Sequence, residues 1–237
     1  MQSTTQIQTT RCQTFKSKPT DTTPLKFGRQ FTDHMFLMKY GGHLPQWNSA
    51  EIRPYGPLNL DPATACLHYG QAIFEGMKCY RTPTGALQLF RPRDNLRRMN
   101  QSAARLMMPQ IDVEFTLEAM KNLLKLDADW VPSKPNTSLY IRPNMFASEA
   151  FLGVHPAEEY IFTIILSPVG NYFSAGQNGI SIHVEEEFSR AAEGGTGGSK
   201  AAGNYAGSFC AASRAAKEGC DQVLWLDGKE HKYIEEI

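Results

Sequence analysis

A lone lysine, Lys200, lies in a stretch of small residues that runs from Glu193 to Ser208 (EGGTGGSKAAGNYAGS). Small side chains let the backbone approach a bulky ligand and leave the lysine amine with little cover. Three interpretations are open: a solvated surface lysine, a phosphate-binding loop, or a lysine that forms a Schiff base. The phosphate-binding motif of nucleotide hydrolases needs Ser or Thr directly after the lysine, and Ala201 stands there instead. A Schiff base needs the deprotonated amine, a form that confinement beside a cationic group favours.

The composition is that of an ordinary globular enzyme. The 237 residues are 41% hydrophobic and carry 24 Lys and Arg against 24 Asp and Glu. This balance argues against a nucleic-acid binder, which needs a basic surface to displace counterions from phosphates. The five cysteines are scattered, with no C-x-x-C pair, so we expect a cytoplasmic protein without a disulfide framework or a metal site. The longest apolar run, 161–166, is far shorter than the ~20 residues of a membrane helix, and no membrane partner is expected.

Hydrophobic periodicity predicts an α/β (α+β) fold. A Pro and a Gly within Thr82–Gly85 favour a tight turn between two strands. After Pro92, apolar residues recur at the spacing of one helix face; a second helix is expected from Thr116 and a third over 204–218, ended by Gly219. Apolar runs and alternation predict strands over 35–40, 76–81, 86–90, 138–142, 159–166, 180–184, 222–227 and 233–237. The last two are expected to form a hairpin around Gly228.

Changes of composition along the chain predict two domains. Residues 1–26 are expected to be a polar tail, and a frayed terminus fits their Thr- and Gln-rich start better than a transit peptide. We expect a small α/β domain over 27–167, an interdomain linker rich in turn-forming residues over 168–179, and the start of a larger domain over 180–237. The chain ends within the last expected strand, so we expect a fragment whose second domain is incomplete.

The lysine segment strongly resembles the cofactor-lysine segment of branched-chain amino-acid aminotransferases, through the pattern Gly-Gly-x-Gly-x-x-Lys-x-x-Gly-Asn-Tyr over 194–205. Other stretches resemble the same family in the same order. They are FTDHMF at 31–36, LHYGQAIFEGM at 67–77, FRP at 90–92 with Arg98-Met99, SLYIRP at 138–143, LGV at 152–154 and QVLWL at 222–226. The resemblance implies a two-domain enzyme of fold type IV, with the second domain incomplete here, that binds pyridoxal 5'-phosphate and forms a homodimer.

The resemblance also implies roles for residues that bind the cofactor. Lys200 matches the lysine that holds the cofactor covalently and then acts as general base. Tyr205 matches the tyrosine that donates a hydrogen bond to the cofactor's phenolic oxygen, and Arg98 matches the arginine that binds its phosphate. Glu236 matches the acid that pairs with the pyridinium nitrogen. Its neighbour Glu235 points to the opposite face of a strand, so one of the two acids at most can fill this role.

A further set of residues matches positions that contact the substrate. Tyr69, Tyr140 and Arg142 match residues that recognise carboxylates. Phe74 and Tyr172 match residues that form the wall of the pocket for the aliphatic side chain. Leu152 and Val154 match residues that reach this pocket from the neighbouring subunit. The implied reaction is transamination between branched-chain L-amino acids (Leu, Ile, Val) and 2-oxoglutarate, giving branched 2-oxo acids and L-glutamate.

Two kinds of alternative remain open. D-amino-acid aminotransferases and aminodeoxychorismate lyases share the lysine and the acid, although the stretches FEGM and SLYIRP favour the branched-chain group. A non-catalytic module that binds a phosphate-bearing ligand, with Lys200 as a simple charge, is the alternative from a different class.

Overall fold

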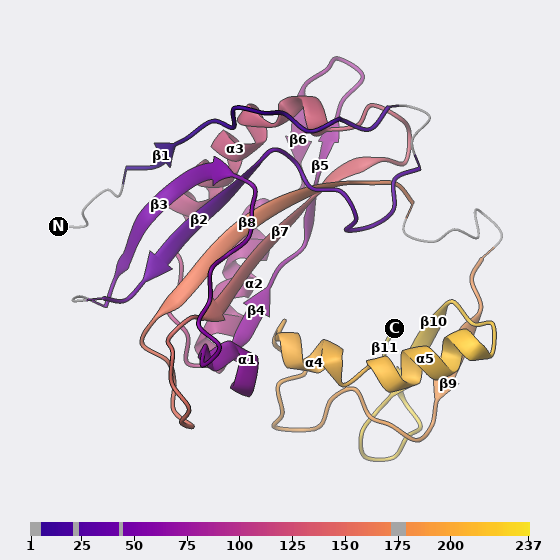
Figure 1. Cartoon of the computed structure of the whole chain (residues 1–237). Helices are drawn as coiled ribbons and strands as arrows, with labels where there is room; N and C mark the ends of the chain where they lie inside the picture. Colours follow the sequence, from indigo (N-terminus) through magenta and orange to yellow (C-terminus); the bar gives the residue numbers. More distant parts are fainter. Residues whose placement is uncertain (1–5, 21–23, 43–44, 172–178) are drawn as a thin grey trace. The chain divides into compact units, whose positions relative to one another are not determined.

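The computed structural model describes residues 6–20, 24–42, 45–171 and 179–237 (Figure 1). The chain divides into two compact units, Met1–Asn171 and Tyr172–Ile237.

A single sheet of eight strands forms the centre of the first unit, in the order β1-β3-β2-β8-β7-β5-β6, with β4 also paired to β7. Its strands are β1 (Gln8–Thr9), β2 (His34–Tyr40), β3 (Trp47–Pro54), β4 (Ala72–Phe74), β5 (Met77–Arg81), β6 (Leu87–Leu89), β7 (Ser138–Ala147) and β8 (Tyr160–Val169). The helices are α1 (Ala65–Tyr69), α2 (Pro92–Arg105), α3 (Val113–Leu126) and the short 3-10 helix η1 (Ala128–Trp130). The expected mixed α/β fold class and the hairpin formed by β5 and β6 are confirmed.

Helices α2 and α3 pack against one face of this sheet (Figure 1). The apolar face predicted for α2 is buried, since Leu96, Met99 and Ala103 are all 0% exposed. Helix α3 begins at Val113, three residues before the expected Thr116, because the side chain of Asp112 accepts a hydrogen bond from the backbone N–H of Phe115 and caps the helix.

Strand β7 continues five residues past the predicted end at Arg142, through Pro143. In an antiparallel strand the N–H and C=O of one residue point to the same side. The carbonyl of Pro143 accepts a hydrogen bond from the backbone N–H of Glu75. The Pro143 nitrogen, which has no hydrogen to donate, therefore also faces Glu75. Pairing with β5 ends at Ile141 and pairing with β4 begins at Asn144, so the proline lies at a break between two neighbouring strands and no ladder bond is lost.

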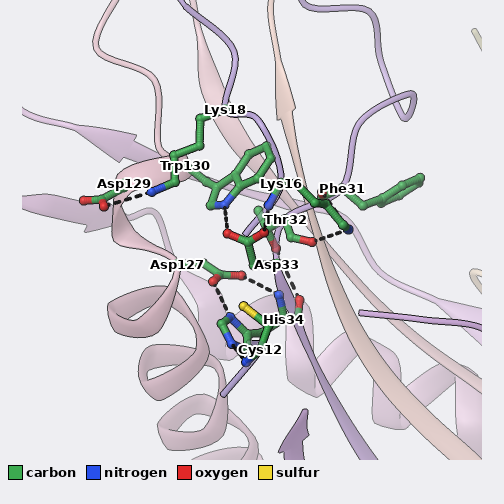
Figure 2. Close-up of polar contacts among 10 residues, drawn as sticks. All are labelled: Cys12, Lys16, Lys18, Phe31, Thr32, Asp33, His34, Asp127, Asp129 and Trp130. Carbon is green, nitrogen blue, oxygen red and sulfur yellow. Dashed lines mark hydrogen bonds and ion pairs between the residues drawn. The ribbon is translucent and has the colours of Figure 1, made fainter. Parts of the chain in front are cut away.

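The N-terminal segment is docked onto the first unit, and the expected frayed terminus is wrong for residues 6–20. Strand β1 pairs in parallel with β3, and the segment then reaches a buried histidine (Figure 2). The backbone N–H of Cys12 donates to Nε2 of His34 at 3.0 Å, so the ring proton lies on Nδ1 and is donated to Asp127 at 2.7 Å. Asp127 also accepts the backbone N–H of His34 at 3.0 Å.

A second buried acid holds the next part of the segment. Asp33 accepts the backbone N–H of Lys16 at 2.8 Å and the indole N–H of Trp130 at 2.7 Å (Figure 2). The amine of Lys16 donates to the carbonyl of Thr32 at 2.7 Å, and burial lowers the pKa of this amine. Composition alone could not reveal this docking, because the acids that hold the segment come from elsewhere in the chain.

The second unit contains a sheet of three strands in the order β11-β10-β9. Its elements are β9 (Ile182–Glu185), α4 (Ala202–Ala206), α5 (Phe209–Lys217), β10 (Gln222–Leu226) and β11 (Ile234–Glu236). The expected hairpin of β10 and β11 is confirmed, and β9 lies parallel to β10. The single helix expected over 204–218 is two helices, which Gly207 and Ser208 separate.

The residues expected to form a linker, 168–179, are described in part. Pro168 and Val169 are the last residues of β8, where they pair with the start of β7. Residues 172–178 lie outside the described part of the chain.

We predict that Asp127→Ala lowers the free energy of unfolding. The substitution leaves the backbone N–H and the ring N–H of His34 buried without an acceptor, at a cost of about 1–3 kcal/mol for each donor. Urea unfolding of the purified protein measures the change. Asp129→Ala is the matched control, because the Asp129 side chain is 80% exposed and its ion pair with Lys18 should contribute less than about 1 kcal/mol. Equal losses in the two variants would contradict the prediction.

Candidate active site

The second unit places the amine of Lys200 beside the hydroxyl of Tyr205. Lys200 follows the glycine-rich loop and lies two residues before α4, and Tyr205 lies within α4. The helical turn brings the tyrosine back toward the lysine, so that Nζ of Lys200 donates a hydrogen bond to the Tyr205 hydroxyl at 2.7 Å. Two of the predicted cofactor residues are therefore in direct contact.

The loop before Lys200 is held by Asn204. The Asn204 side chain accepts a hydrogen bond from the hydroxyl of Thr196 at 2.7 Å. It donates to the carbonyl of Thr196 at 2.8 Å and to that of Ser199 at 2.9 Å. One amide group thus ties Thr196 and Ser199 of the loop to α4. The sequence analysis gave Asn204 no role, although its place in the Gly-Asn-Tyr pattern was the available signal.

Glu236 lies on β11 opposite Trp225 and forms an ion pair with Arg190 at 3.0 Å. Glu235 instead lines an open cavity of about 800 Å³ within the second unit. The walls of this cavity also include Glu193, Gly194, Gly195, Gly197 and Gly198 of the loop, and Asp227, Gly228 and Lys229 of the hairpin. Lys200, Tyr205 and Glu236 are not among its lining residues, and the choice of Glu236 over Glu235 stays a prediction.

Asp227 organises the hairpin that carries both acids. One carboxylate oxygen accepts the backbone N–H groups of Lys232 and Tyr233, at 2.9 and 2.8 Å. The other accepts those of Lys229 and Glu230, at 3.2 and 2.7 Å. These hydrogen bonds hold the pKa of Asp227 well below its usual range, with the bond from Tyr233 as the largest cause.

The first unit gathers Phe74, Tyr140 and Arg142 into one cluster. The guanidinium of Arg142 donates to the hydroxyl of Tyr140 at 3.0 Å and lies 4.5 Å from the centre of the Phe74 ring. The Nε of Arg142 is buried, and within the described residues it has no hydrogen-bond partner. A buried donor without an acceptor is destabilising unless a ligand supplies one, and an anion such as a carboxylate meets this need.

Two residues that the sequence analysis gave no role complete this cluster. The ring of Phe27 packs edge-on against that of Tyr140, with 4.8 Å between their centres. Gly76 provides the space for the Tyr140 hydroxyl, because a Cβ atom at this position would collide with it. Phe27 begins the expected small α/β domain, and Gly76 lies in the stretch FEGM, but neither observation shows which side chain each residue meets.

Arg98 of α2 binds the carboxylate of Glu75 through two parallel hydrogen bonds, at 2.6 and 2.7 Å. The Glu75 side chain is 0% exposed, whereas that of Arg98 is 53% exposed. Glu75 was missed in the sequence, where an acid inside the otherwise apolar run AIFEGM was the signal that could have found it.

Three of the remaining predicted residues, Tyr69, Leu152 and Val154, lie around a loop that follows β7. The Tyr69 ring lies 6.4 Å from that of Phe151, which itself stacks on His155 at 4.1 Å. In the same loop Leu152 is 71% exposed and Val154 is 91% exposed. Tyr172 lies outside the described residues.

Neither a metal site nor a membrane span is present among the described residues. No group of three or more His, Cys, Asp and Glu side chains is placed to hold a metal ion there. Within the same part of the chain, no helix is both long enough and apolar enough to cross a membrane.

We predict that Gly76→Ala displaces Tyr140 and destabilises the first unit by about 1–3 kcal/mol, because the new methyl group collides with the Tyr140 hydroxyl. Urea unfolding gives the free energy, and a crystal structure of the variant should show the moved ring. Gly56→Ala is the control, since a Cβ there meets no atom within 4 Å. An unmoved Tyr140 in the Gly76→Ala structure would contradict the prediction.

Known proteins resemble this chain over most of its length. The family model described as Amino-transferase class IV matches residues 72–235. Branched-chain-amino-acid transaminase 1 of Bacillus subtilis (strain 168) is 50% identical over 224 residues, which are 94% of this chain and 62% of that protein. The branched-chain-amino-acid aminotransferase of Mycolicibacterium smegmatis is 45% identical over 212 residues, covering 89% of this chain and 57% of that protein. The chain therefore spans about three fifths of the length of these curated relatives.

Solved structures support the fold. The branched-chain amino acid aminotransferase from Escherichia coli gives a TM-score of 0.64 at 24% identity, over 86% of this chain and 60% of that one. An aminotransferase from Brucella abortus, solved with the cofactor PLP bound, gives a TM-score of 0.57 at 21% identity, over 81% and 62% of the two chains. Both likenesses confirm the expected fold-type IV architecture. From the family match over most of its length, the chain belongs to the class IV aminotransferases.

Proposed function

We propose that the protein transfers amino groups between branched-chain L-amino acids (Leu, Ile, Val) and 2-oxoglutarate, with pyridoxal 5'-phosphate as its cofactor. The contact between the Lys200 amine and the Tyr205 hydroxyl carries the proposal, because it puts the two groups that this chemistry needs within 2.7 Å of each other. The class IV family and the names of relatives about 50% identical support the choice of reaction and substrates.

The residues of the second unit fit the proposed cofactor. A Cβ atom at Gly194, Gly198 or Gly203 would meet no atom within 4 Å, so there is open space beside these three glycines of the lysine segment. When bound, pyridoxal phosphate accepts the electron pair released as an amino acid loses its Cα proton and carries the amino group between half-reactions. Lys200 would hold the cofactor through its amine, Tyr205 would donate to its phenolic oxygen, and Glu236 would face its ring nitrogen.

Lys200 then moves the proton. With the cofactor bound, the amine of Lys200 would be the base that accepts the Cα proton of an amino-acid substrate. The Tyr205 hydroxyl, which accepts a hydrogen bond from this amine, helps to hold it in place. A base of this kind must lie within hydrogen-bond reach of the proton that it takes, and Asn204 contributes by fixing the loop that leads to Lys200.

The cluster in the first unit supplies substrate recognition. Arg142 and Tyr140 would bind a substrate carboxylate, and the buried Nε of Arg142 is a donor that such a group can satisfy. Phe74 and Tyr172 would form a wall for an aliphatic side chain, and Tyr69 would contribute a further hydroxyl. Apolar and carboxylate-binding groups together would let one pocket accept leucine in one half-reaction and glutamate in the other.

The proposal includes a cytoplasmic homodimer. Leu152 and Val154 are exposed apolar residues, and they match positions that the resemblance assigns to contacts with the neighbouring subunit. In the proposed dimer they would reach the substrate pocket of the neighbouring subunit.

Covalent labelling tests the cofactor and the lysine together. We expect the purified full-length protein to bind added pyridoxal phosphate with a near-visible absorbance band. Borohydride should then leave a permanent adduct, and peptide mass should locate it on Lys200. Lys200→Ala should show no adduct, whereas Lys217→Ala, a substitution on the exposed side of α5, should label normally. Failure to label Lys200 in the full-length wild-type protein would refute the aminotransferase proposal and favour a non-catalytic binding module.

Substitution of Arg142 tests the substrate site. We expect Arg142→Gln to raise the KM for 2-oxoglutarate and leucine roughly 10- to 150-fold, because a hydrogen bond to a charged group contributes about 1.5–3 kcal/mol. Steady-state kinetics with both substrates measure the change. Arg97→Gln is the matched control, since Arg97 is 63% exposed and pairs with Asp94 on the surface of α2. A KM that is unchanged in Arg142→Gln would contradict this role.

A further inference from the structure

Glu75 is a fully buried carboxylate that the proposed reaction does not use. Its side chain is 0% exposed, and it lies between β4 and β5, where the break in pairing beside Pro143 leaves room for it. Its own backbone N–H donates to the carbonyl of Pro143 at 2.9 Å. Burial of a carboxylate is costly unless charged and polar partners surround it, so its partners indicate what the group is for.

Those partners hold the carboxylate in one orientation. Oε1 accepts from Nε of Arg98 at 2.6 Å, and Oε2 accepts from Nη2 of the same residue at 2.7 Å. Oε2 also accepts from the side-chain amide of Asn95 at 3.0 Å and from the backbone N–H of Gly76 at 3.2 Å. Asn95 and Arg98 lie one turn apart on α2, so both reach the carboxylate from the same helix face.

Burial within this ion pair is asymmetric. The acid is completely enclosed, whereas the arginine side chain is 53% exposed. If the pair served stability alone, apolar side chains of similar size would do as well, because desolvation offsets much of the attraction between buried charges. A buried acid that holds one edge of a half-exposed guanidinium instead fixes the plane of that group before a ligand arrives. Preorganisation of this kind lowers the entropic cost of binding.

The other charged pairs of α2 show the contrast. Arg93 binds Glu114 with the same two-bond geometry, at 2.7 and 2.8 Å, but both side chains are exposed, at 50% and 64%. Arg91 and Arg97 share the exposed acid Asp94. Among these arginines, Arg98 alone binds a buried acid.

We infer that Glu75 is a positioning residue that orients Arg98 to bind the phosphate of the cofactor. This inference rests on the proposed function. A guanidinium has five N–H donors in a rigid fork, and a carboxylate that engages two of them sets the direction of the whole group. The residues on either side of Glu75 belong to the substrate cluster, since Phe74 stacks on Arg142 and Gly76 leaves space for Tyr140. The tripeptide 74–76 thus contacts both the substrate cluster and Arg98.

The affinity of the full-length apoprotein for two aldehydes, pyridoxal phosphate and pyridoxal, tests the inference, because the two differ only in the phosphate. We expect Glu75→Gln to weaken binding of pyridoxal phosphate by roughly 10-fold, as removal of a group that orients a metal ligand does. Binding of pyridoxal should not change. The double variant with Arg98→Gln should be no weaker than Arg98→Gln alone, because the two residues would act as one unit. Glu114→Gln, which breaks the exposed pair of the same geometry, should bind both aldehydes like the wild type.

The outcomes separate the alternatives. An equal loss of affinity for both aldehydes, or no loss for either, in Glu75→Gln would overturn the positioning role. If this variant does not fold, Glu75→Asp decides, since it keeps the buried charge but withdraws it from Arg98, and it should show the same phosphate-specific loss. Equal effects on both aldehydes in Glu75→Asp would likewise overturn the inference. Failure of the wild-type protein to bind either aldehyde at Lys200 would instead refute the proposed function.

Discussion

The first unit depends on the alternation of side chains along β7. Leu139, Ile141 and Met145 are 0% exposed in the core, so Tyr140 and Arg142 have to point to the opposite face. A shift of one residue in the pairing would bury the arginine in the core and expose the apolar set. Pairing with β8 along all ten residues of β7 prevents this shift. The hydrophobic core thereby determines which face carries the candidate recognition groups.

The polar groups gather where the regular sheet is interrupted. Beside Pro143, which has no N–H to donate, pairing of β7 passes from β5 to β4. The connecting residues Glu75 and Gly76 therefore lie outside the registered strand pairs, although the backbone N–H of Glu75 still bonds to the carbonyl of Pro143. Glu75 turns its carboxylate toward Arg98 of α2, and Gly76 leaves room for the Tyr140 hydroxyl. A continuous strand would have placed neither group there.

The second unit relies on side chains that bond to the backbone. Its apolar cluster is small and consists of Ala211, Ala215, Val223 and Trp225 with two partly buried neighbours. Polar side chains hold its loops instead. Asn204 binds two carbonyls around the glycine-rich loop, and Asp227 accepts four backbone N–H groups in the hairpin. These local interactions position Lys200 and the acids of β11 without a large core.

The sequence alone determined the elements and the chemistry of single residues. Periodicity predicted the β5–β6 and β10–β11 hairpins and the apolar face of α2, because these patterns depend on neighbours close in the chain. The sequence also marked Lys200, because the small residues that surround it are its neighbours along the chain. The roles of Arg98, Arg142 and the other candidate residues came from resemblance, and they stay predictions.

Contacts between distant segments were decided by the tertiary structure. The docking of residues 6–20 depends on Asp33 and Asp127, and the orientation of Arg98 depends on Glu75, which lies 23 positions earlier. The start of α3 and the break between α4 and α5 also differed from expectation, and at α3 the reason is a capping side chain that extends the helix toward its N-terminus. Periodicity reports which face of an element is buried, but it does not report which polar group will lie opposite. Buried polar groups need hydrogen-bond partners, and the partners within reach depend on how distant segments of the chain pack together.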